Sequence, residues 1–486
     1  MSTTRRQFLQ QSALFGGALA VLGPFQALSA RKAAAAAPAT VAGYGPLVNK
    51  GPLWLPAEFN FQIISVQGQP MSDGNPTPGI FDGMAAYPGK QGTTVLIRNH
   101  ENRERAGEIK VLTPTALQYN TEAFGGNTKL VVQRSRIGTD PDTKQHLYNY
   151  EVIEQFAILG GTSTNCAGGI RSPHTWITCE EVVKRLNDKK HGYIFEIDAT
   201  ADGPVEARAV PQCGRRAHEA ALESTGIIYM TEDRGLSPDL QLGMIGSCFY
   251  RYVPTQRGNV PLADTSGVLQ ALKLRDEFHA NMDTGRVVGV PYRVEWVTVD
   301  EPDHDDDTDD LRDRLPGLTP NRVAAQDKGA AFFDRLEGMW TEPGQTRIYF
   351  VTTAGGPANL GQVWEYSPGR ETLTLIYEST DAALLQSPDN VVIVPQTQDV
   401  LLCEDSDGEQ FIRGVTAQGA IYDFARTTLN DSEFCGACFD PDGQTLYVNQ
   451  QGDRGSLPNG PLNGNAVTYA IYGPFEKRNG NSAKNI

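Results

Sequence analysis

The sequence predicts an all-β fold, a β-propeller that forms a single large domain of roughly six blades with insertions. The first observation behind this is composition. The 486 residues include 50 Gly and 30 Pro, and apolar residues seldom recur with the 3.6-residue period of a helix. The second observation is a loose repeat. Short strands that end near Cys179, Thr231, Thr352, Cys403 and Val448 suggest units of about 40 to 50 residues, the spacing of propeller blades.

Each predicted strand is β-branched or aromatic and is bounded by turn residues. A further unit is expected to end near Thr298 to Glu301, and a pair of β-sandwiches remains the competing fold. The strands are expected at 93–101, 175–178, 227–233, 347–353, 399–405 and 444–450, with partner strands at 191–198 and 361–366.

The first thirty residues have the pattern of an export signal rather than of a folded segment. Arg5 and Arg6 precede an apolar run at 13–22, and small residues follow at 27–30, which is a twin-arginine signal. We expect residues 31–50 to be a linker or a first edge segment, and residues 51–486 to form the propeller domain. No other stretch has about 18 uninterrupted apolar residues, so we expect no stable membrane insertion. The predicted location is the periplasm or the outside of the cell, reached through the twin-arginine export machinery.

The formal net charge of −16 restricts the partners. Nucleic acid needs basic grooves for its phosphates, so we expect no nucleic-acid partner. An anionic substrate would need local cations, either metal ions or a few arginines. We expect a monomer that binds a small molecule.

Residues 163–181 contain a candidate metal site, because a short strand there ends in Cys179, Glu180 and Glu181. A thiolate favours iron, zinc or copper, whereas carboxylates suit calcium, magnesium or ferric iron. The alternative is a buried cysteine followed by two solvated acids. The seven cysteines are an odd number, so in an oxidising compartment at least one stays unpaired or binds something.

Further acids follow or precede the predicted strands. In a propeller the inner strands line a central channel, so these acids would converge there and repel one another unless cations neutralise them. Taken singly, each is equally well explained as a surface acid. They are Glu101, Glu180, Glu181, Glu219, Glu232, Asp233, Glu337, Asp389, Glu404, Asp405 and Glu433.

An ordered series of motifs over about residues 82–450 resembles the PhoX-type alkaline phosphatases, which are twin-arginine-exported propellers. The resemblance implies a phosphomonoesterase with a cluster of ferric iron (Fe³⁺) and calcium, in which a cysteine thiolate binds the iron. Such ions would activate water and neutralise the phosphate, so no side-chain nucleophile is needed. The motifs are Asn99-His100-Glu101, Asn165-Cys166-Ala167-Gly168-Gly169, Thr178-Cys179-Glu180-Glu181, His218-Glu219-Ala220, Arg335-Leu336-Glu337-Gly338, Ser387-Pro388-Asp389-Asn390 and Phe439-Asp440-Pro441-Asp442-Gly443.

Carried over by position, the resemblance implies that Cys179 is the iron thiolate and that Glu219 and Glu337 are metal carboxylates. Arg335 and Arg171 resemble the cations that hold the substrate phosphate, since an arginine fork binds two phosphate oxygens at once. The expected calcium ligands are Glu180, Asp389, Glu404 and Glu433.

Two other functions remain open. One is a calcium-dependent hydrolase of another ester, such as a lactonase-like propeller, in which a thiolate would be unnecessary. The other is a non-catalytic secreted propeller in which calcium only stabilises the fold. Iron bound through a thiolate would separate the phosphatase from the calcium-dependent hydrolase, and an assay on an aryl phosphate, with and without calcium and chelator, would separate it from the non-catalytic propeller.

Overall fold

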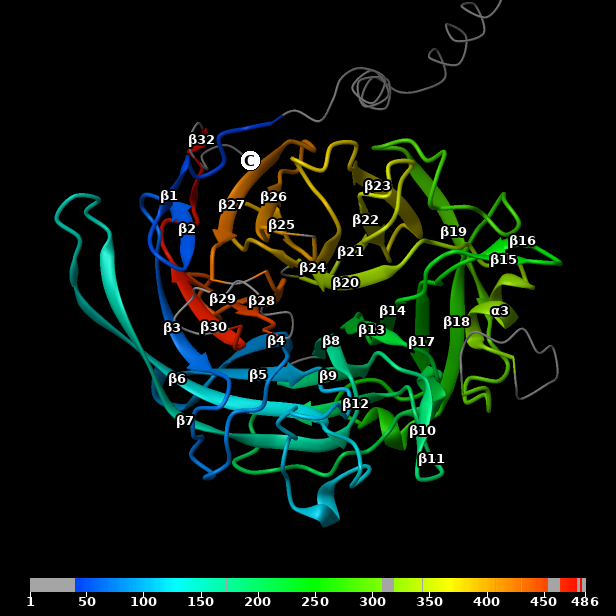
Figure 1. Cartoon of the computed structure of the whole chain (residues 1–486). Coiled ribbons are helices and arrows are strands. Elements are labelled where there is room, and N and C mark those ends of the chain that lie inside the picture. Colours follow the sequence, from blue (N-terminus) through cyan, green and yellow to red (C-terminus); the bar gives the residue numbers. More distant parts are fainter. Residues whose placement is uncertain are drawn as a thin grey trace, which may run out of the picture.

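Six antiparallel blades surround a common centre in the computed structural model of the chain (Figure 1), and blades three and four are joined into one sheet. It describes residues 40–171, 174–307, 319–342, 344–406, 408–429, 431–452, 464–478 and 481–482. The predicted signal at 1–30 lies outside the described residues. In the described part, no helix is long and apolar enough to cross a membrane.

Each blade is numbered here in chain order of its innermost strand. Blade one is β4 (Phe81–Pro88), β5 (Thr94–His100), β6 (Gly125–Thr139) and β7 (His146–Thr162), and blade two is β8 (Asn165–Arg171), β9 (Thr175–Glu180) and β12 (Ile194–Asp198). Blade three is β13 (His218–Ser224), β14 (Ile227–Glu232), β17 (Tyr250–Pro254), β18 (Gly267–Leu274) and β19 (Pro291–Thr298). Blade four is β20 (Leu336–Thr341), β21 (Ile348–Thr352), β22 (Gln362–Ser367) and β23 (Thr372–Glu378).

Blade five is β24 (Pro388–Ile393), β25 (Val400–Glu404), β26 (Phe411–Val415) and β27 (Ile421–Thr427), extended by β2 (Leu53–Pro56) and β1 (Leu47–Asn49). Blade six is β28 (Phe434–Phe439), β29 (Thr445–Gln450), β30 (Val467–Tyr472) and β3 (Asn60–Val66). The smaller elements are the α-helix α3 (Asn321–Gln326), the 3₁₀ turns η1 (Lys90–Gly92), η2 (Thr115–Leu117), η3 (Pro211–Cys213) and η4 (Leu262–Asp264), and the strand pairs β10 (Lys184–Leu186) with β11 (Lys189–His191), β15 (Ser237–Asp239) with β16 (Gly243–Ile245), and β31 (Lys477–Arg478) with β32 (Asn481–Ser482).

The six inner strands form a closed ring. Each inner strand contacts the next in the order β4, β8, β13, β20, β24 and β28, and β28 returns to β4. The predicted propeller is therefore confirmed over the competing pair of sandwiches. The ring is sealed by β3, an N-terminal strand that pairs with β30 of the last blade, so both ends of the domain contribute to one sheet.

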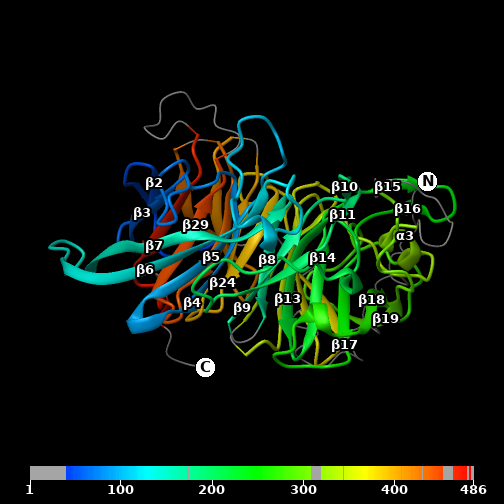
Figure 2. The same ribbon diagram turned by 90° about the horizontal axis from the view of Figure 1, so that it is seen from below.

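The predicted blade boundaries need one correction. The unit expected near Thr298 to Glu301 is not a blade, because β19 is an outer strand of blade three that also pairs with β23 of blade four. The blade that the spacing overlooked is blade one, whose long β6–β7 hairpin projects beyond the ring in Figures 1 and 2. The long β6–β7 hairpin makes blade one longer than the 40- to 50-residue spacing by which the other blades were recognised.

Residues 40–50 lie against blade five. Thr40 forms a bridge to Ile421, and β1 is the edge strand next to β2. The described part of this segment is therefore an edge segment, one of the two forms expected for 31–50. The division into signal, linker and domain stays a prediction.

The core lies between neighbouring blades. Between blades three and four, for example, Phe249 stacks on Phe350 with ring centroids 4.7 Å apart, and Trp364 and Tyr366 pack beside them. Such large buried side chains keep the blades rigid relative to one another, and this fixes the positions of the inner strands.

Candidate metal centre

The second residue of each inner strand occupies a repeated position. In every blade, a β-bulge interrupts the ladder between the inner strand and its neighbour near this residue. Bulges re-aim side chains and are common beside active sites. The six second residues are Asp82, Cys166, Glu219, Glu337, Asp389 and Cys435.

A second repeated position is the residue directly after the second strand of each blade. It carries an acid in four blades, Thr353 in blade four and Gln451 in blade six. The four acids are Glu101, Glu181, Asp233 and Asp405. Because both positions lie at the same end of the inner strands, their side chains meet.

These groups form one continuous cluster. It consists of four triplets of ligand atoms, each with all its atoms within 4.8 Å of one another. One triplet shares a residue with the next, so the cluster crosses the ring from blade one to blade six. The triplets are Asp82, Glu101 and Cys166; Cys166, Glu181 and Glu219; Glu219, Glu337 and Asp389; and Asp389, Asp405 and Glu433.

The cluster is too buried and too acidic to be stable as a set of anions. Burial, followed by repulsion from neighbouring carboxylates, raises the pKa of Glu219 and Glu337 well above the ordinary range. The same causes raise the pKa of Asp389 to about 7. Burial and the carboxylates of Asp82 and Glu219 also raise the pKa of the Cys166 thiol.

Glu219 gives the sharpest indication of a cation. Its side chain is fully buried, and neither Oε1 nor Oε2 has a hydrogen-bond partner in the described part of the chain. A buried carboxylate without a partner is costly, whereas a metal ion within the triplets of Glu219 would satisfy both oxygens. The carboxylate oxygens of these triplets suit ions such as calcium, and the one sulfur, that of Cys166, suits a transition metal such as iron.

The channel is closed below the cluster because the inner strands approach one another closely. A Cβ on Gly83 would lie 2.7 Å from the Ala167 Cα, and one on Gly338 would lie 2.5 Å from the Asp389 carbonyl oxygen. The space left there is a cavity of only about 10 Å³. Substrate must therefore reach the cluster from the face where the second strands end, which also carries the β10–β11 and β15–β16 hairpins (Figure 2).

Arg335 lies at this open end. Its guanidinium donates to Asp233 at 3.0 and 3.1 Å and to Glu337 Oε1 at 2.7 Å, while 40% of its side chain is exposed. Its backbone is left-handed, with φ of 54°, a conformation that non-glycine residues seldom adopt and that recurs at functional sites. The Arg335 guanidinium therefore contacts the buried carboxylates and is at the same time partly exposed to solvent.

Comparison with known proteins identifies the family. The profile of the family described as alkaline phosphatase PhoX matches residues 42–453. The chain belongs to the PhoX alkaline phosphatase family. It is a hydrolase of phosphate esters, and its acidic cluster suits a family of metalloenzymes.

Two solved structures are similar to this chain. The structure of Pseudomonas fluorescens PhoX in complex with vanadate, a transition state analogue, matches 89% of this chain and 98% of its own, with a TM-score of 0.60 and 16% identity. The WD40 repeats of RRP9 match 84% of this chain and 99% of their own, with a TM-score of 0.37 and 8% identity. Curated protein sequences give no match.

The structure brings together five of the nine site residues that the PhoX resemblance implied. Glu219, Glu337, Asp389 and Glu433 belong to the cluster, and Arg335 contacts it. The other four lie elsewhere: Cys179, Glu180, Glu404 and Arg171.

Cys179 lies in an apolar layer between blades two and three rather than in the PhoX cluster. It packs with Ile177, Ile194, Cys213 and Met230, and burial raises the pKa of its thiol. It precedes Glu181 by two residues, which places it about 7 Å deeper along the strand. The sulfur in the cluster is that of Cys166 on β8.

Glu180 and Glu404 are each one residue away from a cluster position, and alternation along a strand turns their side chains away from the channel. Glu180 accepts hydrogen bonds from the backbone N–H groups of Ser163, Gly192 and Tyr193 and lies 2.6 Å from His191 Nδ1. It therefore has a structural role.

Glu404 likewise accepts a hydrogen bond from the Gln386 N–H at 2.9 Å and one from Arg413 Nε at 3.2 Å. The channel positions belong to their neighbours Glu181 and Asp405.

Arg171 lies at the opposite end of β8 from Cys166, about 17 Å along the strand. It is buried, with ion pairs to Glu196 and Glu223 and hydrogen bonds to the backbone of Gly258 and Val260 at 2.7 Å. The contacts with Glu223, Gly258 and Val260 tie blade two to blade three, whereas the pair with Glu196 lies within blade two. In the structure Arg171 therefore does not contact the cluster.

Of the five cluster residues that were not assigned as ligands, Glu101, Glu181 and Asp405 had been expected among the converging acids, whereas Asp82 and Cys166 had not been expected there. A signal was available for them, because each lies at the second position of an inner strand or directly after a second strand. Comparing the starts of the six inner strands would have found this repeat.

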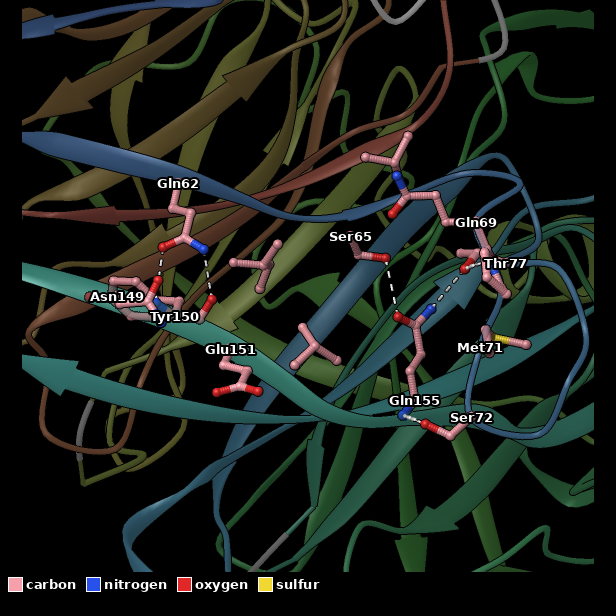
Figure 3. A pocket seen from close by; sticks show the side chains of 14 residues that line it. Gln62, Ser65, Gln69, Met71, Ser72, Thr77, Asn149, Tyr150, Glu151 and Gln155 are labelled. Carbon is pink, nitrogen blue, oxygen red and sulfur yellow. Dashed lines mark hydrogen bonds between the residues drawn. The ribbon is translucent and has the colours of Figure 1, made fainter.

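A separate polar cavity of about 460 Å³ lies between β3 and β7 (Figure 3). There the Gln62 amide donates to the Tyr150 carbonyl at 2.7 Å and accepts from the Tyr150 N–H at 2.9 Å, so it substitutes for a missing strand. The backbone N–H of Gln155 donates to the Ser72 hydroxyl at 3.0 Å, and its side-chain amide donates to the Thr77 hydroxyl at 3.1 Å. These contacts join blades six and one and contain no group suited to phosphate chemistry.

Proposed function

We propose that this chain is an exported phosphomonoesterase that depends on an iron and calcium cluster. The observation that carries the proposal is Glu219, a fully buried carboxylate whose two oxygens have no partner in the described residues. It is surrounded by other acids whose pKa values are raised by burial. Bound cations would neutralise this arrangement, which without them needs protons on some of its carboxylates.

The donor types suggest where each metal binds. The part of the cluster around Cys166 would hold ferric iron, because it offers a thiolate, the iron ligand that the family resemblance implies, together with the carboxylates that suit ferric iron, those of Asp82, Glu101, Glu181 and Glu219. The all-oxygen part of the cluster would hold calcium. Its residues are Glu337, Asp389, Asp405 and Glu433.

When bound, these metals would supply an activated water and neutralise phosphoryl charge. Arg335 would bind the phosphoryl oxygens, because its guanidinium is partly exposed at the open end and is held in place by Asp233 and Glu337. The closed floor at Gly83 and Gly338 keeps the ester on one side of the cluster. Because the carboxylates of the cluster are already held in position by the inner strands, they need no rearrangement during the reaction.

Export through the twin-arginine route is part of the proposal and rests on Arg5 and Arg6 of the signal pattern. This route carries proteins that are already folded, which suits a site that must be loaded before export. We place the mature protein in the periplasm or outside the cell, as a monomer.

The test is metal analysis of protein exported in its native host, together with assays on an aryl phosphate. We expect iron and calcium in the protein, an iron–thiolate charge-transfer band, and loss of hydrolysis after chelation that calcium and iron restore. Full activity in protein that contains no iron would contradict the assignment and would favour the calcium-dependent hydrolase.

A further inference from the structure

Arg98, on β5, is a fully buried arginine that is not one of the cluster ligands. Its guanidinium forms no ion pair within the described residues. Instead, Nη1 donates to the Thr468 hydroxyl at 2.7 Å and Nη2 to the Thr128 hydroxyl at 3.2 Å, while Nε has no partner there. The Phe81 ring centroid lies 3.5 Å from its Cζ. A buried charge without a carboxylate partner is costly, so these contacts require an explanation.

One chain of hydrogen bonds leads from Arg98 to Asp82. The Thr468 hydroxyl, which accepts from Arg98, donates to Asn449 Oδ1 at 2.6 Å. Asn449 Nδ2 in turn donates to the Asp82 carbonyl at 2.7 Å. This chain starts in blade one, passes through β30 and β29 of blade six and returns to blade one. It therefore holds the start of β4 across the joint at which the last blade meets the first.

A second chain of hydrogen bonds leads from Arg98 to the backbone beside Glu101. Thr128 Oγ1 lies 2.9 Å from His100 Nε2, and His100 Nδ1 lies 2.9 Å from the Gly79 carbonyl oxygen. In a neutral ring, Nδ1 donates to Gly79 and Nε2 accepts from Thr128, so both nitrogens fix the orientation of the imidazole. Because His100 directly precedes Glu101, this chain holds the backbone from which the Glu101 side chain starts.

The Phe81 ring connects the two chains. Besides its contact with the Arg98 guanidinium, it packs edge to face against the His100 imidazole, with ring centroids 5.4 Å apart. Phe81 directly precedes Asp82. The three contacts of Arg98 thus lead to the backbone that carries Asp82 and Glu101, two of the three members of a triplet that contains the sulfur.

We propose that Arg98 is a positioning residue for this triplet, which holds the Asp82 and Glu101 carboxylates in the geometry that binds a metal ion together with Cys166. This inference rests on the metal centre of the proposed function. Groups that hold metal ligands from outside orient them, and losing such a group costs about ten- to a hundredfold in metal affinity. A guanidinium suits this role because its planar fork donates to two acceptors in a fixed geometry.

The test uses full-length protein loaded with iron and calcium. Arg98→Met removes the donors of both chains, whereas Thr468→Val and Thr128→Val each break one chain and keep Arg98. We measure iron and calcium affinity by competition with a chelator, using the iron–thiolate charge-transfer band and the released metal, and we measure stability by urea unfolding.

The matched control is Arg216→Met. Arg216 is also fully buried, forms no ion pair within the described residues, and has its Cζ 3.8 Å from the Tyr250 ring centroid. Its side chain donates to groups that are not cluster ligands. They are Asn321 Oδ1, the Cys213 carbonyl and Met230 Sδ.

We expect Arg98→Met to bind iron about ten- to a hundredfold more weakly, and each threonine variant to lose a smaller part of the affinity. Calcium affinity of the all-oxygen half should be unchanged. Arg216→Met should lose stability but keep the iron affinity of the wild type. A purely structural role of Arg98 would lower the stability of both arginine variants and the iron affinity of neither.

Wild-type iron affinity in Arg98→Met would overturn the inference. An equal loss of iron from Arg216→Met would also overturn it, because the loss would then follow from unpacking any buried arginine. If Arg98→Met does not fold, the threonine variants decide, and unchanged iron affinity in both would overturn the inference.

Failure of the proposed function is distinguishable from failure of this inference. A wild-type protein that binds iron but hydrolyses no aryl phosphate would refute the phosphatase. Weaker iron binding by Arg98→Met would still support the positioning role.

Discussion

The two halves of the cluster are built on the same strand positions but offer different chemistry. In blades one to three the converging ligands include one sulfur, that of Cys166, among carboxylates. In blades four to six all ligands are oxygens. One repeated backbone position can therefore offer a metal a mixed sulfur and oxygen donor set on one side of the ring and an all-oxygen donor set on the other.

Blade six shows that strand position alone does not make a ligand. Cys435 is the equivalent of Cys166 on its inner strand, yet its Sγ donates to the Phe81 carbonyl at 2.9 Å and is absent from the ligand triplets of the described residues. Glu433, just before the strand, takes the cluster position instead. The bulge in blade six is shifted by one residue relative to the others, which accounts for the exchange.

The largest expected effect comes from removing the sulfur. Cys166→Ala should lose iron and reduce kcat/KM more than about a hundredfold, since replacing even an outer-shell partner of a metal costs up to that factor. Metal analysis, the charge-transfer band and the aryl phosphate assay measure these effects.

The matched control is Cys179→Ala. It should keep iron and activity, and lose about 1 kcal/mol of stability because its apolar layer loses a buried sulfur. If Cys179→Ala lost iron while Cys166→Ala kept it, the cluster would have to be rebuilt around β9.

A smaller effect is expected in the all-oxygen half. Asp405→Asn should lower bound calcium and reduce kcat/KM about ten- to a hundredfold, with iron retained. Glu404→Gln, its neighbour, should keep both metals and lose about 1 to 3 kcal/mol of stability, because Arg413 loses a charged partner. Equal calcium loss in both variants would show that the alternation along β25 does not divide their roles.

The remaining expected effect is a pH dependence of the stability of the chelated protein. The pKa of Asp389 is raised to about 7, so between about pH 4 and pH 7 the folded state holds a proton that the unfolded state has released. Stability should therefore fall as pH rises through this window, by at most about 4 kcal/mol for this group. Urea unfolding at several pH values, with and without chelator, measures this.

Bound cations should remove this dependence, because they replace the proton. Asp389→Asn should also flatten the pH profile of the chelated protein. If the stability of the chelated wild type rose from pH 5 to pH 7, the raised pKa of the buried Asp389 carboxyl would be contradicted.

Local sequence was sufficient for most of the second strands of the blades. β5, β14, β21, β25 and β29 all lie where alternating apolar residues and turn residues predicted them. Glu219, Glu337 and Asp389 were found because they belong to recognisable motifs, and Glu433 because it is one of the acids beside the predicted strands. The choice between Cys166 and Cys179 could not be made, since both belong to such motifs and both are buried.

The sequence by itself determined the strands, the propeller class and the acidic and thiol groups available to the site, because these follow from short-range patterns. Only the tertiary structure decided which of two neighbouring residues reaches the channel. A bulge or a one-residue change of register turns a side chain to the opposite face of a sheet. Glu180 and Glu181 therefore differ in role although they are adjacent in the chain.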